Sequence, residues 1–374
     1  MRIADFALER YFARWEFAVE HVLGASDVEG WSMSELLALA DDETRSMWDG
    51  LRLGYTESTG HPLLRAEIAK LYESLDPDDV LVFAGAEEAV FCLFSTSVEA
   101  GDHVIVTWPG YQSLYEVARA AGAHVSLHAL LEDDGWSLDV DRLIRSFRPE
   151  TRVVVVNAPH NPTGMLPSEA DWRRLAAACA EARIRLVADE VYRFLEHDEA
   201  ATLPAGADLD ERAISIGVMS KSFALAGLRI GWLATRDRAV LERCARMKDY
   251  TTICSSAPSE VLALIGLRAR DRVLARSREI VAANLEVLDR FFDRRADALR
   301  WVRPRGGSIG FPRLVPGGPA GASAERFAAA LVEKTGVLLL PSSTFGVGDS
   351  HVRIGLGRRD LPEAVEKLER FLDA

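Results

Sequence analysis

Two basic residues with different chemistry lie eight positions apart in residues 218–231, Val-Met-Ser-Lys-Ser-Phe-Ala-Leu-Ala-Gly-Leu-Arg-Ile-Gly. The first, Lys221, is one of only five lysines in a chain rich in arginine. An amine can lose its proton in a desolvated pocket and attack a carbonyl to form a Schiff base, whereas a guanidinium stays protonated. The second, Arg229, carries a planar fork that suits a phosphate. A nucleophilic amine beside an anion-binding fork indicates pyridoxal 5'-phosphate (PLP).

The sequence around Lys221 sets it apart from a solvated surface lysine, which is the ordinary alternative. Lys70, Lys334 and Lys367 lie in helical stretches with a polar pattern, where a solvated face is expected. Lys221 instead follows an apolar run, residues 213–219, and precedes a second strand-like stretch, residues 229–234. It is therefore predicted at the carboxyl end of a buried strand, where α/β sheets bind their ligands.

Short β-branched runs alternate with helical patterns over most of the chain. This alternation predicts a mostly parallel sheet that helices cover on both faces. The helical patterns include residues 87–98, 111–121 and 168–182. The seven predicted strands are residues 80–83, 103–107, 124–128, 152–157, 184–188, 213–218 and 229–234.

The pattern changes after about residue 240. A long helical stretch is predicted from Ser259 to about Asp297, followed by short strands and a last helix, which is typical of a smaller α+β domain. The aromatic-rich start of the chain is expected to pack on this small domain or on a dimer partner, or to form a flap over a site. The predicted parts are an N-terminal segment (1–45), a large cofactor-binding domain (46–255) and a small C-terminal domain (256–374).

Composition excludes several classes of protein. A net charge of −13 argues against nucleic acids and anionic membranes as partners. No run approaches 18 uninterrupted apolar residues, and charges interrupt the N-terminus where a secretion signal needs an apolar stretch. The four cysteines show no paired metal-ligand spacing, so we expect no metal site and a reduced, cytoplasmic protein.

Polar residues follow several other predicted strands. Gly85, Ala86 and Glu87 open a helix, and their backbone N–H groups can receive a phosphate. Tyr111 offers an aromatic ring after the next strand. Asn161 lies in the turn Asn-Ala-Pro-His-Asn-Pro-Thr-Gly, residues 157–164. Asp189 directly follows an apolar run, where it is either a helix N-cap or a buried carboxylate that needs a charged partner.

Taken in order, these motifs resemble the class I and II aminotransferases of the aspartate aminotransferase, or fold type I, superfamily. The resemblance runs from about Gly54 to Arg353. It implies a PLP-dependent aminotransferase that moves an amino group between an α-amino acid and a 2-oxo acid through a Schiff base on Lys221. It also implies a homodimer with shared active sites, in which Tyr55 reaches the phosphate of the neighbouring subunit.

The resemblance also assigns roles to single residues. Lys221 would bind PLP and move the proton, and Asp189 would keep the pyridine nitrogen protonated. Asn161 and Tyr192 would bind the phenolic oxygen of the ring, and Tyr111 would stack on its face. Arg353 would bind the α-carboxylate of the substrate, beside Asn161. The phosphate would be bound by Gly85, Ala86, Glu87, Ser220 and Arg229.

Two features depart from the family pattern. Val218 stands three residues before the lysine, where relatives often have a phosphate-binding serine, so Ser220 or Ser222 would have to compensate. Glu87 and Glu88 would repel a phosphate if their side chains pointed inward.

One alternative class of reaction stays open, and two other functions are disfavoured. The stretches Gly-Tyr-Thr-Glu-Ser-Thr-Gly-His-Pro and Lys-Asp-Tyr-Thr-Thr-Ile-Cys-Ser-Ser-Ala-Pro are similar to the branch that includes capreomycidine synthases, so elimination, cyclisation or decarboxylation is the alternative. A non-catalytic PLP-binding regulator is disfavoured, because no helix-turn-helix module precedes the enzyme-like part. A nicotinamide dehydrogenase is disfavoured because no Gly-x-Gly-x-x-Gly follows a strand.

The sequence does not identify the substrate. Four acidic residues near the N-terminus could bind a cationic side chain, although a solvated helix face is the more ordinary interpretation. They are Glu16, Glu20, Asp27 and Glu29.

Overall fold

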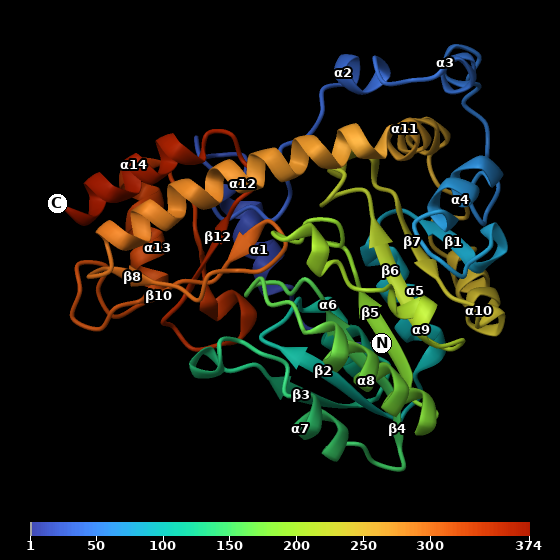
Figure 1. The fold of residues 1–374 in the computed structure, drawn as a ribbon, viewed down its shortest axis with the longest axis horizontal. Helices are drawn as coiled ribbons and strands as arrows, with labels where there is room; N and C mark the ends of the chain where they lie inside the picture. The colour runs from blue at the N-terminus through green and yellow to red at the C-terminus, as the bar shows by residue number, and fades with distance from the viewer. Residues whose placement is uncertain (1) are drawn as a thin grey trace.

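The computed structural model describes residues 2–374, and its centre is a seven-stranded sheet (Figure 1). The strand order is β1-β7-β6-β5-β4-β2-β3, with β7 antiparallel to both neighbours and the remaining pairs parallel. The predicted mostly parallel α/β sheet is therefore confirmed. Its strands are β1 (Val80–Phe83), β2 (His103–Trp108), β3 (His124–Ala129), β4 (Thr151–Asn157), β5 (Arg185–Asp189), β6 (Ile214–Val218) and β7 (Gly231–Ala234).

Helices cover both faces of this sheet, because its central strands are apolar on both sides. In β4, Val153 and Val155 pack with α5 (Ala86–Ser97), α6 (Ser113–Ala120) and α10 (Arg238–Lys248). Val154 and Val156 point the other way, toward α7 (Val140–Arg145) and α8 (Glu169–Glu181). The short α9 (Gly206–Leu209) contacts β5 and β6. The carboxyl ends of β1, β2, β4, β5 and β6, which precede candidate residues, therefore lie at one edge of this sheet, between its two helical layers.

The C-terminal part begins with two helices that cross the top of the molecule in Figure 1. They are α11 (Ala257–Arg268) and α12 (Arg270–Arg294), so the stretch predicted from Ser259 to about Asp297 is helical as far as Arg294, with one turn at Ala269 that was not predicted. α13 (Ala324–Thr335) and α14 (Leu361–Leu372) pack against each other, and α14 packs on α12. The strands here are short: β8 (Leu299–Arg300) pairs with β10 (Arg313–Leu314), and β12 (Val352–Gly355) lies between β11 (Leu340–Pro341) and β9 (Ile309–Gly310).

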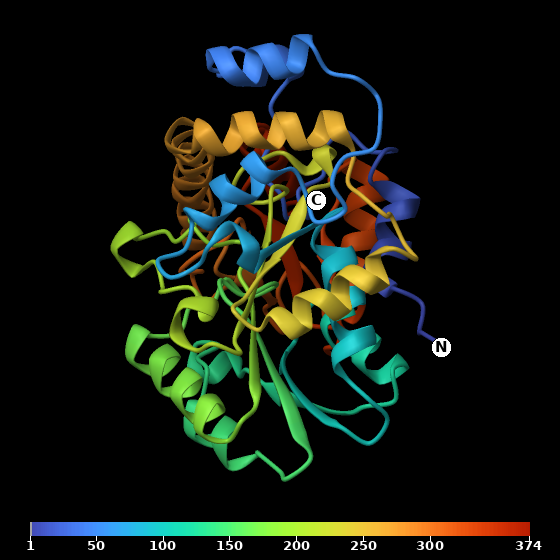
Figure 2. The ribbon, with the colours of Figure 1, turned by 90° about the vertical axis from the view of Figure 1, so that its right-hand side faces the viewer.

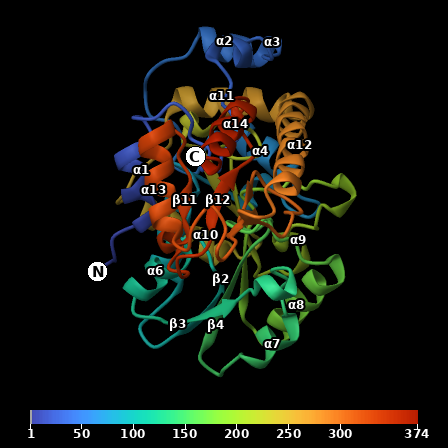
Figure 3. The same cartoon turned by 90° about the vertical axis from the view of Figure 1, so that its left-hand side faces the viewer.

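The N-terminal segment is spread over the molecule. Helix α1 (Ala7–Trp15) lies beside α13 in Figure 3 and contacts η5 (Ser342–Phe345). Four of the five aromatic residues around it belong to the same hydrophobic cluster as Phe345: Phe6, Tyr11, Phe12 and Trp15. The fifth, Phe17, is 95% exposed, so it does not pack within this chain, and its packing on a dimer partner stays a prediction. Helices α2 (Met33–Leu37) and α3 (Asp42–Asp49) lie over α11 (Figure 2). Helix α4 (Pro62–Ala69) then packs on α11 and β1.

Between α1 and α2 the chain is hydrogen-bonded to the C-terminal strands. The amide of Gly24 donates to the carbonyl of Leu338 at 2.7 Å, and the amide of Leu338 donates to the carbonyl of His21 at 2.9 Å. The amide of Gly355 donates to the carbonyl of Leu23 at 2.5 Å. A Cβ on Gly355 would lie 2.1 Å from the Ala25 carbonyl oxygen, so this close approach requires glycine. Residues 21–25 are therefore bound to the C-terminal part by backbone hydrogen bonds, with one parallel bridge between His21 and Val337.

The side chain of His21 reinforces this attachment. It is buried, and its Nδ1 atom lies 2.7 Å from a carboxylate oxygen of Asp360, at the start of α14.

No helix between residues 2 and 374 is long and apolar enough to cross a membrane.

Candidate active site

A cavity of about 400 Å³ opens at the carboxyl ends of the central strands. Loops after β1, β2, β4, β5 and β6 line it, together with α1 and β12. It brings together most of the residues that the sequence singled out. Those that line it are Ala86, Glu87, Tyr111, Asn161, Asp189, Tyr192, Ser220, Lys221, Arg229 and Arg353.

Lys221 follows β6 and reaches into this cavity. Its ammonium donates to the Ser26 hydroxyl at 2.8 Å and lies 5.7 Å from the centre of the Tyr192 ring. A second lysine, Lys248, is more deeply buried, but it lies outside the cavity and donates to the carbonyls of Ser58 and Val82 at 2.5 and 2.8 Å. Of these two amines, the half-buried Lys221 therefore faces a space that can hold a ligand, and the buried Lys248 does not.

Asp189 ends β5 at the floor of the cavity. It is 5% exposed, and one carboxylate oxygen accepts a hydrogen bond from the amide of Val191 at 3.3 Å. Across the sheet it pairs with Asn157, whose side chain donates to the Asp189 carbonyl at 2.9 Å. Burial raises the pKa of Asp189 to about 7. Within residues 2–374 this carboxylate has no ion pair, so the site can accept a cation from a ligand.

Two side chains near Lys221 present oxygen atoms to the cavity. The Tyr192 hydroxyl is buried and has no hydrogen-bond partner in the described chain. Asn161 is held at its backbone and at its side chain: its backbone N–H donates to Asn157 Oδ1 at 2.6 Å, and its Oδ1 accepts from Arg353 at 3.2 Å. A buried hydroxyl without a partner costs stability, so this position favours a ligand that bonds to it.

The N-terminus of α5 and Arg229 form the anion-binding side of the cavity. Gly85 is the N-cap of α5, and no side chain of residues 2–374 caps this end, so its first N–H groups are free to bind an anion. A Cβ on Gly85 would lie 2.6 Å from the Arg229 guanidinium, and its φ of 87° also favours glycine. Arg229 itself has a φ of 53°, a strained conformation of the kind that clusters at functional sites.

The neighbours of this loop show how the two departures from the family pattern are accommodated. Val218 lines the cavity without offering a hydroxyl, but the hydroxyl of Ser220 lines it as well and lies 3.5 Å from Arg229 Nη1. Glu88 turns away, because its carboxylate accepts from the Ala84 amide at 2.6 Å and from Thr252 at 2.7 Å. Glu87 faces the cavity, where burial raises its pKa to about 7. A carboxyl group that is half protonated near neutral pH repels an anion less than a fixed negative charge does.

Arg353, on β12, is the deepest cation of the site at 1% exposed. Its Nε and Nη2 atoms donate to the carbonyl of Gly24 at 3.1 and 2.8 Å. The guanidinium carbon lies 5.9 Å from the Phe12 ring centre and 5.5 Å from that of Phe345. This rigid fork is suited to a carboxylate.

Two parts of the site depend on more than the strand ends. Tyr55 lies outside this chain's cavity and is 89% exposed, so its contact with the phosphate of the neighbouring subunit stays a prediction. The N-terminal segment forms one wall of the cavity, of which the sequence predicted only some acidic residues. Of the four acidic candidates, Glu16 and Asp27 line the cavity, whereas Glu20 and Glu29 do not. Spacing along α1 could have shown that its cavity-facing residues share one helix face, but not what that face covers. The wall consists of Leu8, Glu9, Phe12, Glu16, Ala25, Ser26 and Asp27.

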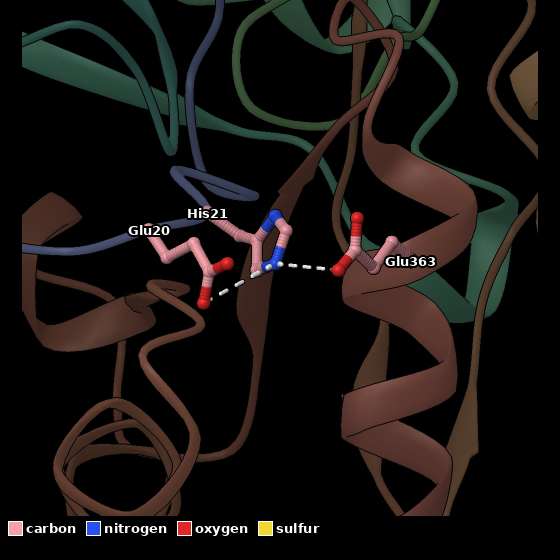
Figure 4. A group of neighbouring side chains, drawn as sticks. All are labelled: Glu20, His21 and Glu363. Atoms are coloured by element: carbon pink, nitrogen blue, oxygen red, sulfur yellow. Dashed lines mark ion pairs between the residues drawn. The ribbon is translucent and has the colours of Figure 1, made fainter.

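A separate group of ligand-type side chains lies near α14 (Figure 4). The Nε2 atom of His21 lies 3.9 Å from carboxylate oxygens of both Glu20 and Glu363. However, the ammonium of Lys367 lies 2.6 Å from the same oxygen of Glu20. Because a cation already occupies that carboxylate, we assign no metal to this group.

Comparison with known proteins identifies the family. The model of the family "Aminotransferase class I and II" matches residues 26–368. This chain belongs to that family. It is 31% identical over 355 residues to a capreomycidine synthase of Streptomyces vinaceus, covering 94% of this chain and 88% of the relative. It is 30% identical over 328 residues to an arginine–pyruvate transaminase of Pseudomonas aeruginosa, covering 84% and 81%. A PLP-dependent aminotransferase from Streptococcus suis has a similar structure, with a TM-score of 0.92, 28% identity and coverage of 100% and 98%.

This family member is therefore a PLP-dependent enzyme of fold type I, as predicted. The residues of the cavity fit the cofactor: an amine, a buried carboxylate without a cation, a buried hydroxyl without a partner in residues 2–374, and an uncapped helix N-terminus beside an arginine. The amine matches the aldehyde of PLP, and the carboxylate matches its pyridine nitrogen. The hydroxyl matches the phenolic oxygen, and the helix N-terminus with the arginine matches the phosphate.

Proposed function

We propose that this aminotransferase moves an amino group from an α-amino acid to a 2-oxo acid, with Lys221 as the catalytic base and Schiff-base lysine. One observation carries the proposal: Lys221 and Arg353 line the same cavity, and the buried carboxylate of Asp189 lies at its floor. An amine that moves a proton and a fork that binds a carboxylate are the two groups that an α-amino acid requires.

Each residue has one task in this proposal. PLP, when bound, supplies an electrophilic carbon and a ring that accepts an electron pair. Asp189 keeps the ring nitrogen protonated, and its cost of burial is offset by that charge. Tyr192 and Asn161 bind the phenolic oxygen, and Tyr111 stacks on the ring face. Lys221 carries the proton, and its hydrogen bond to Ser26 orients the amine.

Anion binding is divided between two arginines. Arg229, Ser220 and the amides of residues 85–87 bind the phosphate, and Arg353 binds the α-carboxylate beside Asn161. Since Arg353 is held by the Gly24 carbonyl and two aromatic rings, it loses little conformational entropy when it binds the substrate.

Elimination or cyclisation of an amino acid is the second candidate. The similarity to a capreomycidine synthase over 94% of this chain supports it, because the same lysine and arginine would be needed. The two reactions differ in stoichiometry, since transamination consumes one 2-oxo acid per amino acid and cyclisation consumes none.

A purified enzyme with PLP distinguishes the two candidates. We would supply a panel of amino acids with and without pyruvate or 2-oxoglutarate and quantify all products by mass spectrometry. Formation of a new amino acid in strict dependence on the 2-oxo acid supports transamination. A dehydrated or cyclic product that forms without any 2-oxo acid would contradict it.

We further propose a cytoplasmic homodimer with shared active sites. The loops around Tyr55 and Tyr250 expose apolar side chains, including Leu53 and Ile253, and Lys248 bonds to the carbonyl of Ser58 next to them. Exposed apolar side chains in adjacent loops favour an interface with a second copy, in which Tyr55 reaches the neighbouring phosphate. Four free cysteines, three of them buried, support a reducing compartment.

A further inference from the structure

One wall of the cavity is acidic, and its charges have few partners. Glu9 and Phe12 of helix α1 and its C-cap residue Glu16, which still has helical dihedral angles, line the cavity together, since residues three and four apart share a helix face. Asp27 lines the same wall from the following loop. The wall therefore offers three carboxylates to a molecule that is bound between Lys221 and Arg353.

Among these carboxylates, Glu16 is the one without a protein partner. Asp27 accepts from Arg358 at 3.0 and 3.1 Å, and Glu9 accepts a long bond from the Tyr111 hydroxyl at 3.5 Å. Within residues 2–374, the Glu16 carboxylate has neither a hydrogen bond nor an ion pair. Burial raises its pKa, the nearby Asp27 and Glu9 raise it further, and Arg358 and Lys221 act in the opposite direction. A cation brought by a ligand would relieve this repulsion.

The position of Phe12 separates this wall from the α-carboxylate site. Its ring lies against the Arg353 guanidinium, and Glu16 follows one helical turn later on the same face. A molecule with its carboxylate on Arg353 and its amino group near Lys221 can therefore extend its far end past an aromatic ring toward carboxylates. The buried Arg353 and the Tyr192 hydroxyl without a partner in the described chain show that the same cavity is built for a ligand.

We infer that the amino-acid substrate carries a second positive charge, an ammonium or guanidinium at the end of its side chain, and that Glu16, with Asp27, selects it. This inference rests on the proposed function and specifies its substrate. The acidic wall would also reject substrates with a side-chain carboxylate, because like charges would meet in a half-buried place.

Pairs of amino acids with equal length and different charge test the inference. We would compare arginine with citrulline, and lysine with 2-aminoheptanoate, measuring kcat and KM separately in the purified holoenzyme. The expected kcat/KM is on the order of 10- to 100-fold higher for the cationic member of each pair, which is the range for a hydrogen bond to a charged group. Equal or better use of the neutral member would overturn the inference.

The matched variants are Glu16→Gln and Glu20→Gln. Glu16→Gln should raise KM for arginine about 10-fold and leave citrulline unchanged, whereas Glu20→Gln should change neither, because Glu20 pairs with Lys367 outside the cavity. An equal loss for both substrates in Glu16→Gln would mean that Glu16 serves Lys221 instead, and would overturn the inference. Asp27→Asn is a less specific test, since it also removes the ion pair between Asp27 and Arg358.

A binding measurement separates the failure of this inference from the failure of the proposed function. Calorimetry with the Lys221→Ala variant loaded with PLP needs no turnover. Tighter binding of arginine than of citrulline, lost in Lys221→Ala/Glu16→Gln, supports the acidic wall even if the reaction is not transamination. Equal binding of both ligands would overturn the inference even if transamination is observed.

Discussion

Replacing Asp189 with asparagine should stabilise the apoprotein and inactivate the holoenzyme. The carboxylate is 5% exposed and accepts one long hydrogen bond, from Val191. Its pKa rises from 3.8 to about 7 on folding, mainly because of burial, and Glu190 and Glu87 add to the rise while Lys221 opposes it. Since one pKa unit corresponds to about 1.4 kcal/mol, ionised Asp189 lowers the stability of the apoprotein by up to about 4 kcal/mol above pH 7.

The sign of this effect defines the measurement. Below pH 3.8 Asp189 is protonated in both the folded and the unfolded chain and costs nothing; the cost grows as pH rises and levels off above pH 7. Urea denaturation of the apoproteins should therefore show that Asp189→Asn is more stable than the wild type, and that this difference in unfolding free energy grows by about 2 to 3 kcal/mol from pH 5 to pH 8. Comparison with the wild type is essential, because burial also raises the pKa of Glu190 to about 7.

The holoenzyme should respond in the opposite direction. Asparagine cannot hold a proton on the ring nitrogen, so turnover should fall by several orders of magnitude, as for other preorganised electrostatic groups. A variant with near-normal turnover, or a stability difference that is the same at pH 5 and pH 8, would refute the assignment of Asp189 as a buried carboxylate that waits for a cation.

Three other changes test the remaining parts of the site. Lys221→Ala should abolish turnover and the absorbance of the Schiff base between protein and PLP, while circular dichroism stays unchanged; a reducible covalent adduct in this variant would refute the role of Lys221. Gly85→Ala should weaken PLP binding at least about 10-fold in equilibrium dialysis, because its Cβ would meet the Arg229 guanidinium at 2.6 Å and its φ is positive; unchanged retention would contradict the proposed phosphate site. Mixing inactive Tyr55→Ala and Lys221→Ala chains should restore part of the activity, since one intact site forms per mixed dimer, whereas an Arg353→Ala and Lys221→Ala mixture should stay inactive; an active monomer in sedimentation would exclude shared sites.

The sequence was sufficient for those residues whose position depends on a strand end. Asp189 and Asn161 follow apolar runs, and parallel strands bring their carboxyl ends to the same edge of the sheet, so their meeting could be predicted. The turn at Ala269 could not, because no glycine or proline marks it and the apolar spacing continues through α11 and α12.

The acidic wall depends on tertiary packing and was correspondingly harder to predict. Glu16 and Glu20 are both acidic residues on a short N-terminal stretch, and only the docking of α1 over the cavity separates the one that lines it from the one that pairs with Lys367. Ser26 gave no signal in the sequence, since its contact with Lys221 joins residues 195 positions apart. Tyr55 stays a prediction, because its proposed role requires a second subunit.

The attachment of residues 21–25 to the C-terminal strands has a consequence for protein engineering. The stretch that runs between Glu16 and Asp27 is fixed by backbone hydrogen bonds to Leu338 and Gly355, and Arg353 lies on the same strand as Gly355. In the proposed site, the two ends of a bound substrate would thus contact segments that are distant in the chain but hydrogen-bonded to each other. A chimera that exchanges only the first thirty or so residues between relatives would inherit the acidic side chains without the strand that aligns them. Transfer of substrate preference therefore requires that the N-terminal segment and the β11–β12 region be exchanged together.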